Sequence, residues 1–316
     1  MIREARLRSL WAGPAGAYAA LGFSVLVWGS AFAGIRVGLE AYTPGQVALL
    51  RFLAASLVLV ALSFRGGIPR PRTRDLPAFF GLGFLGIAFY NVVLGLAQRH
   101  IPSGQASFLV ATAPVWMALV ASALFAERLR WAGWAGIGIS VLGISLIAFA
   151  PGGGFPLDPY ALVALLAALA QGMFFLGQKP LLHRYRPREV ATLALWAGTL
   201  LLLPFLPGLP GAILRAPLRV TAAVVYLGVF PGALGYVTWS YGLSKLPAPI
   251  VGSFLYLVPP VALLVAWLWL GEVPRPAALA GGGIVLAGVV LVSKFGREAP
   301  RSPAPSPCQD EACEGF

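Results

Sequence analysis

The chain alternates long apolar stretches with short polar segments along most of its length. The stretches lie at residues 15–35, 45–64, 76–97, 103–125, 131–150, 159–177, 190–206, 220–243, 250–270 and 277–292. Most are close to the roughly 20 residues that an α-helix needs to cross about 30 Å of hydrocarbon. Backbone polar groups in lipid are satisfied only in helices or closed barrels, and barrel strands would be shorter and alternating. The pattern therefore predicts ten transmembrane helices.

The apolar pattern occurs twice along the chain, and the same residue types recur at a near-constant distance from one copy to the other. Aligned pairs include Trp28 and Gln171, Phe32 and Phe175, Tyr42 and Tyr185, Gly83 and Gly228, Pro114 and Pro259, and Glu127 and Glu272. Each copy holds five spans, and an odd number forces the copies into opposite orientations. We predict an all-α integral membrane protein with two inverted five-helix repeats, residues 1–150 and 151–294, and a disordered cytoplasmic tail, 295–316. Such repeats are typical of transporters whose site lies between the halves.

The composition supports a membrane protein and changes how the charge is interpreted. The 316 residues are 59% hydrophobic and only 11% charged, with a mean hydropathy of +0.82. The formal net charge of +12 would otherwise suggest a nucleic-acid partner. However, most lysines and arginines fall in segments such as 65–74, 179–188 and 294–301, which share one side of the membrane. The positive-inside rule then predicts a multi-pass inner-membrane protein with both termini cytoplasmic, in contact with anionic lipids and not with nucleic acid.

Charged side chains are absent from the middle of the predicted spans. All 11 acidic residues and both histidines lie at span ends, in loops or in tails. This weakens proton antiport, because a coupling proton needs a buried acid or histidine. Arg51 is the one charge well inside a span, and we expect it to reach the outer surface or to pair with Glu40. Cys308 and Cys313 have no further ligand nearby, so we expect no metal site and no cofactor.

Neutral polar and aromatic residues gather instead near the middle of six spans. They are Trp28, Ser30, Tyr90, Asn91, Ser107, Thr112, Gln171, Tyr236, Trp239, Ser253 and Tyr256. These spans form repeat-related pairs: the first with the sixth, the third with the eighth and the fourth with the ninth. We predict that the eleven residues line an uncharged, wet cavity that binds substrate at the repeat interface. The alternative for each residue is a helix–helix hydrogen bond or an interfacial ring.

Prolines interrupt the same spans. Pro114 and the pair Pro259 and Pro260 lie near the centres of the fourth and ninth spans, and Pro231 lies in the eighth. Proline removes a helical hydrogen bond and kinks the helix, so these positions are predicted hinges, although static bundles also contain kinks. The glycine-rich spans 131–150 and 277–292 are assigned to packing between halves or within a homodimer, and the protein is expected to be a monomer or homodimer.

Several short motifs together point to one family. The chain contains Trp28-Gly29-Ser30-x-Phe32, a Leu-Leu-Arg-Phe run ending at Phe52, and a segment from Pro114 to Glu127 that recurs from Pro259 to Glu272. Over about residues 16–294 these resemble the EamA-type transporters of the drug/metabolite transporter superfamily. The resemblance implies an exporter or facilitator of small metabolites, often amino acids, with a central cavity among the same six spans.

The sequence thus favours a carrier that moves a small neutral or zwitterionic metabolite outward by alternating access. An intramembrane lipid-modifying enzyme is a weaker alternative, because such chemistry needs a nucleophile–base pair or a metal cluster that the sequence does not offer. We therefore do not expect an enzyme. A non-transporting membrane sensor or assembly subunit is the remaining alternative, although no signalling domain is attached.

Overall fold

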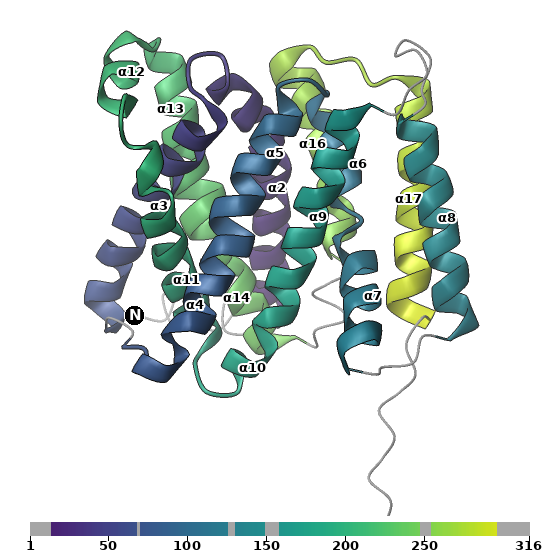
Figure 1. The fold of residues 1–316 in the computed structure, drawn as a ribbon, viewed down its shortest axis with the longest axis horizontal. Helices are drawn as coiled ribbons and strands as arrows, with labels where there is room; N and C mark the ends of the chain where they lie inside the picture. The colour runs from purple at the N-terminus through teal and green to yellow at the C-terminus, as the bar shows by residue number, and fades with distance from the viewer. Residues whose placement is uncertain (1–13, 68–69, 126–129, 149–157, 247–253, 296–316) are drawn as a thin grey trace, which may run out of the picture.

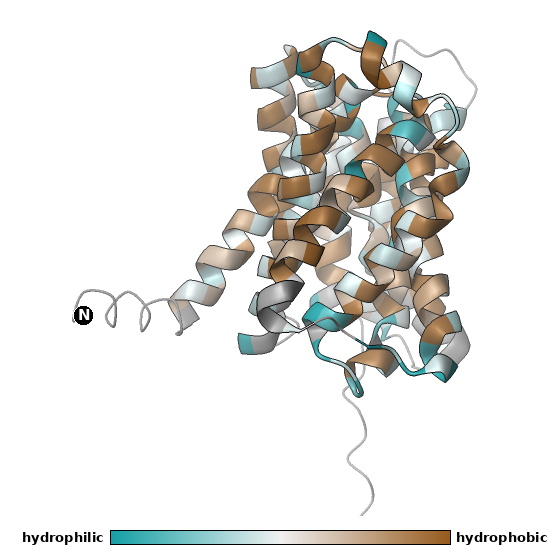
Figure 2. Cartoon of the chain, turned by 90° about the vertical axis from the view of Figure 1, so that its left-hand side faces the viewer, coloured by the Kyte–Doolittle hydropathy of each residue, from teal (hydrophilic) through white to brown (hydrophobic). Residues whose placement is uncertain are grey.

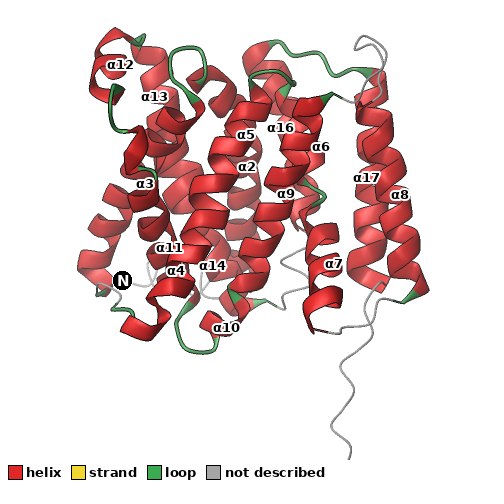
Figure 3. Ribbon diagram, viewed as in Figure 1, coloured by secondary structure: helices red, strands yellow, loops and turns green. Residues whose placement is uncertain are grey.

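The computed structural model describes residues 14–67, 70–125, 130–148, 158–246 and 254–295. The first half contains α2 (Pro14–Gly38), α3 (Pro44–Gly66), η1 (Thr73–Asp75), α4 (Leu76–Leu82), η2 (Gly83–Phe89), α5 (Tyr90–Gln98), α6 (Ser103–Val110), α7 (Ala113–Phe125) and α8 (Trp131–Ala148). The second half contains α9 (Pro159–Gly177), α10 (Lys179–Leu182), α11 (Pro187–Leu201), η3 (Leu203–Phe205), α12 (Leu209–Arg215), α13 (Leu218–Leu227), η4 (Gly228–Leu234), α14 (Gly235–Lys245), η5 (Phe254–Leu257), α16 (Val258–Leu270) and α17 (Pro276–Phe295). These elements form one bundle (Figure 1). Within the described residues there is no strand, and the predicted all-α class is confirmed (Figure 3).

The bundle has the dimensions and surface of a membrane protein. Among the described residues, five helices are long and apolar enough to cross a bilayer: Ala15–Gly38, Pro44–Leu62, Thr73–Gln98, Pro159–Leu182 and Leu218–Trp239. Three shorter apolar helices are Trp131–Leu146, Phe254–Leu270 and Pro276–Leu291. Polar residues gather toward the two ends of the bundle and apolar residues dominate between them (Figure 2). The count of ten crossings stays a prediction.

Local signals in the sequence set where helices begin. At the start of α3, the Thr43 hydroxyl accepts a hydrogen bond from the Gln46 backbone N–H at 3.3 Å, and the Gln46 side-chain oxygen accepts one from the Thr43 N–H at 3.0 Å. This capping box satisfies two N–H groups that lack helical partners. The Asp158 carboxylate accepts from the Tyr160 N–H at 2.9 Å at the start of α9. Proline follows each cap, where its missing N–H costs nothing.

Repeat-related π-helical segments interrupt the third and eighth predicted spans. η2 separates α4 from α5 and η4 separates α13 from α14, and each π-segment begins at an aligned glycine, Gly83 or Gly228. Each packs against the other half, η2 on α11 and η4 on α3. A Cβ at Gly83 would lie 2.8 Å from the Ala194 carbonyl oxygen, and one at Gly228 would lie 2.7 Å from the Ala54 Cβ. The two halves therefore interlock where glycine lets helices approach closely.

The fourth and ninth predicted spans are broken near their prolines. α6 ends at Val110 and α7 begins at Ala113, directly before Pro114. In the ninth span a 3-10 turn, η5, precedes α16, and Pro259 and Pro260 lie in the first turn of α16. Backbone N–H groups in the first helical turn have no partner within the helix, so proline, which lacks an N–H, is tolerated there and the helix can restart at it. Both spans thus contain a break where a kinked continuous helix was expected.

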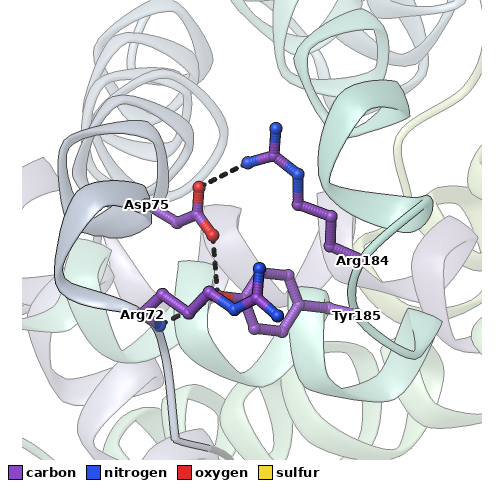
Figure 4. Close-up of polar contacts among 4 residues, drawn as sticks. All are labelled: Arg72, Asp75, Arg184 and Tyr185. Carbon is purple, nitrogen blue, oxygen red and sulfur yellow. Dashed lines mark hydrogen bonds and ion pairs between the residues drawn. The ribbon is translucent and has the colours of Figure 1, made fainter.

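Polar contacts of similar design tie the two ends of the bundle. At the end predicted to be cytoplasmic, the buried Asp75 carboxylate accepts from Arg184 at 2.7 Å and from the Tyr185 hydroxyl at 2.8 Å (Figure 4). The Tyr185 hydroxyl also accepts from the Arg72 backbone N–H at 2.9 Å. The aligned tyrosine at the opposite end, Tyr42, bonds Thr221 at 2.6 Å. Each contact ties a loop of one half to the start of a helix in the other.

Nearby at that opposite end, Glu40 pairs with Arg219 at 2.7 Å. The expected pairing of Glu40 with Arg51 is therefore wrong.

The glycine-rich helices α8 and α17 pack against each other at one edge of the bundle (Figure 1). Ser140, Val285 and Val289 are fully buried there. Trp131 and Trp134 in the first turn of α8 are exposed, as lipid-facing residues of a membrane protein would be. This is the packing between halves that the sequence predicted for these spans.

Candidate functional site

A cavity of about 110 Å³ lies between the two halves. Its lining residues are Trp28, Ala31, Phe32, Ile35, Arg51, Tyr90, Leu94, Ser107, Val110, Ala111, Ala113, Pro114, Gln171, Phe175, Tyr236, Leu255, Tyr256, Val258 and Pro259. Both repeats contribute, and the wall is mainly apolar with a few polar groups. This volume is enough for several water molecules, and a mostly apolar wall with convergent polar groups is the usual character of a small-molecule site.

Arg51 lies in this wall, which corrects two expectations. Its side chain projects from α3 and is only 7% exposed, so it does not reach the outer surface. The Nη1 group donates a hydrogen bond to the Asn91 side-chain oxygen at 2.9 Å, and the guanidinium carbon lies 5.1 Å from the centre of the Phe52 ring. The buried Nε has no hydrogen-bond partner. The prediction of an uncharged cavity is therefore wrong.

Asn91 positions Arg51 and is itself held by the π-segment that precedes it. The Asn91 side-chain NH₂ donates to the carbonyl of Ile87 at 2.8 Å, and more weakly to that of Gly86 at 3.4 Å. Both carbonyls belong to η2, where the α-helical hydrogen-bond pattern is altered. Because the Asn91 amide nitrogen donates to these backbone carbonyls, its oxygen is left to accept the hydrogen bond from Arg51. Asn91 does not line the cavity, but it orients a group that does.

Aromatic rings from both repeats form another part of the wall. Trp28 donates its indole N–H to the Pro231 carbonyl at 3.0 Å, so a predicted hinge residue anchors a lining residue. The Trp28 ring centre lies 5.6 Å from that of Tyr236 in an edge-on arrangement, and 4.9 Å from that of Trp239. Trp239 is buried behind Trp28 against Leu21 and does not line the cavity. The pair Trp28 and Tyr236 presents the aromatic surface.

Gln171, the repeat counterpart of Trp28, contributes a polar group. Its side chain is 9% exposed, lines the cavity, and leaves its buried Oε1 without a partner. Ser107 also lines the cavity, but its hydroxyl donates to the Gly104 carbonyl at 2.6 Å. A buried polar atom without a partner is costly, so the Gln171 oxygen marks a place where water or a ligand is stabilising.

Of the eleven predicted binding residues, the structure brings Trp28, Tyr90, Ser107, Gln171, Tyr236 and Tyr256 to the cavity wall, together with the predicted hinges Pro114 and Pro259. Two others make helix contacts away from it: Ser30 bonds the Val27 carbonyl and the Tyr226 hydroxyl, and Thr112 bonds the Leu109 carbonyl. Ser253 lies outside the described residues.

Sequence reasoning missed Arg51 and the apolar wall of Phe32, Phe175 and Leu255. A charge well inside an apolar span was the available signal for Arg51. Among the described residues, no three His, Cys, Asp or Glu side chains group as metal ligands do.

Comparison with known proteins places this fold and cavity in a family. The sequence profile described as the EamA-like transporter family matches residues 16–149 and again 158–294. The chain belongs to the EamA-like transporter family. This EamA-like protein is thus a multi-pass membrane transporter with a two-repeat helical fold, and its substrate is a small molecule.

Relatives of this EamA-like transporter align over most of their length. A probable terminal-alkyne amino-acid exporter of Streptantibioticus cattleyicolor is 44% identical over 275 residues, covering 87% of this chain and 92% of the relative. An uncharacterized transporter of Bacillus subtilis, YdfC, is 38% identical and covers 83% and 86%. A chain of known crystal structure matches with a TM-score of 0.61 at 21% identity, covering 88% of this chain and 96% of that one, and supports the fold alone.

Proposed function

We propose that this EamA-like transporter exports small neutral or zwitterionic metabolites, with amino acids as its foremost substrates, through the cavity between the repeats. The observation that carries the proposal is the cavity itself, since it combines an apolar wall with the polar groups of Arg51 and Gln171 and the rings of Trp28 and Tyr236. Such a wall suits a small molecule that has both an apolar body and polar ends.

The relatives support the choice of amino acids. The relative from S. cattleyicolor carries the name of a probable terminal-alkyne amino-acid exporter, and its match covers 87% of this chain. An amino acid with a short apolar side chain matches the small, largely apolar cavity, where a ring such as Trp28 would also attract an ammonium group.

Alternating access is the transport mechanism that we infer. The helix breaks before Pro114 and Pro259 occupy aligned positions and border the cavity, so they are suited to act as hinges with Pro231 and Pro260. Helix breaks absorb backbone rotation at few residues, which lets one half rock against the other.

Glu272 provides a contact that closes the outer end. Its carboxylate accepts from the Ser103 backbone N–H at 2.9 Å and from the Ser103 hydroxyl at 3.4 Å. This joins the start of α6 in the first half to the segment after α16 in the second. We propose that the contact breaks when the outer side opens. The aligned residue Glu127 lies outside the described residues.

The same proposal includes the topology. We place both termini in the cytoplasm and the protein in the inner membrane, because the basic residues favour that side. The division near residue 150, the tail after residue 294, and a monomer or homodimer complete the organisation that we propose.

Flux through the purified protein tests the function. Proteoliposomes loaded with a labelled panel of neutral amino acids should lose label faster than protein-free liposomes, and unlabelled substrate outside should accelerate exchange. Folded protein that moves none of a broad panel of neutral amino acids would contradict the proposal.

A further inference from the structure

We propose that Arg51 binds the carboxylate of the transported substrate, which makes the cavity a site for carboxylate-bearing zwitterions. The inference rests on the proposed transport function and adds the chemical group that the substrate must carry. It starts from Arg51, the one charged side chain among the described residues of the cavity wall.

The Arg51 guanidinium is buried and incompletely satisfied. It lines the cavity, is 7% exposed, and has a buried Nε without a hydrogen-bond partner. The ion pairs found among the described residues join Arg184 to Asp75 and Arg219 to Glu40, so none of them neutralises Arg51. A buried cation without a counter-ion is destabilising, and an anionic ligand group would remove that penalty.

The guanidinium is also held in a fixed place. One N–H group is bonded to Asn91, whose own amide nitrogen is anchored on the Ile87 carbonyl. An arginine offers five N–H donors in a planar fork that matches a carboxylate in a bidentate manner. A pre-positioned fork with free donors is suited to recognition, because little side-chain freedom is lost when the ligand binds.

The rest of the wall lacks this cationic feature. The residue aligned with Arg51 in the second repeat is Ala194, and the residue aligned with Asn91 is Tyr236. The scaffold is therefore similar in both halves, whereas the chemistry of the lining is not. The cation lies in the first half, and the second supplies the Tyr236 ring and the Gln171 Oε1.

This asymmetry gives the substrate an orientation. The carboxylate lies at Arg51, and the ammonium lies at the rings of Trp28 and Tyr236 or at the unpartnered Gln171 oxygen, which attract a cation and accept its hydrogen bonds, respectively. The aliphatic body then lies on Phe32, Ile35 and Leu94. A free amine or an amide of the same side chain would leave Arg51 uncompensated.

A comparison of acids with their amides tests the proposal. Proteoliposomes are loaded with L-leucine, L-methionine or L-propargylglycine, and in parallel with the corresponding carboxamides. We expect the parental protein to move the acids at least about tenfold faster than the amides, because a site built for a polar group rejects analogues that lack it. In Arg51→Gln the preference should disappear, and in Arg51→Lys it should fall but persist. Arg215→Gln, an equal charge change at an exposed position on α12, should keep the parental ratio.

The ratio of acid to amide separates recognition from a purely structural role. If Arg51 only stabilised the fold, Arg51→Gln would slow acids and amides alike and keep their ratio, and that result would overturn the inference. An absence of acid preference in the parental protein would also overturn it, even with active transport. If Arg51→Gln does not fold, the acid-to-amide flux ratio is measured in Arg51→Lys instead, and an unchanged ratio there would overturn the inference.

The absence of flux for every compound would overturn the proposed function, and binding would then decide the inference. Thermal unfolding of the detergent-solubilised protein is measured with each acid and each amide. Stabilisation by acids that is lost in Arg51→Gln supports carboxylate binding. Equal stabilisation by acids and amides, or none by either, overturns it.

Discussion

At the residue scale, Trp28 connects the cavity to both repeats. It belongs to the first half, donates to the Pro231 carbonyl of the second, and packs on Tyr236 and Trp239. Trp28→Ala should reduce amino-acid flux about tenfold, since an aromatic contact is worth about 1–2 kcal/mol and about 1.4 kcal/mol is a factor of ten in affinity. Trp134→Ala, on the exposed face of α8, is the matched control. Flux at the parental rate in Trp28→Ala would show that this part of the wall does not contact substrate.

Asn91 belongs to the same scale, but its effect should be on stability as well as transport. Asn91→Leu removes the acceptor for Arg51 and the donor for Ile87, and leaves buried polar groups unpaired. We expect the free energy of unfolding to fall by about 1–3 kcal/mol. Intrinsic tryptophan fluorescence during heating measures the change. Ser145→Ala, which removes an exposed local hydrogen bond, should leave the unfolding temperature nearly unchanged.

How far single residues could be predicted depended on their chemistry. A neutral ring or amide in mid-span has few reasons to be there other than a cavity or a helix contact, and Trp28, Tyr90 and Gln171 lie in the cavity wall. Ser30 and Thr112 carry the same signal in the sequence, but each donates its hydroxyl to a backbone carbonyl three residues earlier, because a hydroxyl can bond a nearby carbonyl. The prediction for Arg51 was wrong because its hydrogen-bond partner, Asn91, lies 40 residues away in another span, and the sequence does not show which spans pack together.

At the scale of elements, the glycines that begin the π-segments let helices of the two halves pack closely. Gly228 of η4 lies against the backbone and side chains of α3, so Gly228→Ala forces a methyl group into occupied space. Overpacking of this kind costs about 1–3 kcal/mol, and we expect a clear fall in unfolding temperature. Gly81→Ala is the control, since a Cβ there meets nothing within 4 Å. Equal unfolding temperatures for the two variants would contradict the interlocking.

Helix positions were largely predictable from apolar length, whereas their interruptions were not. The prolines indicated an irregularity in the fourth and ninth spans, but a proline in the sequence does not distinguish a kinked helix from a broken one. No proline marks η2 in the sequence. This π-segment packs against α11, a distant part of the chain, and such a contact cannot be read from the local sequence.

At the scale of the whole molecule, the alternating access that we propose requires the two halves to separate at one end. Ser103 and Glu272 can be replaced together by cysteine in a protein whose own Cys308 and Cys313 are changed to serine. A short thiol-reactive cross-linker across the pair should hold the outer end closed and stop flux, and a cleavable linker should restore it after reduction. The single-cysteine variants should transport with or without cross-linker. Undiminished flux in the cross-linked protein would exclude this contact as a gate.

The matching positions of the two π-segments bear on how the repeats arose. A π-segment is an α-helix that has accepted an extra residue, and η2 and η4 begin at aligned glycines and end at aligned positions, Phe89 and Leu234. Two independent insertions at one place in both copies are a far less economical history than one. A π-segment that was already present in one repeat before duplication explains both η2 and η4 with a single event, and the same close packing then recurs in each half.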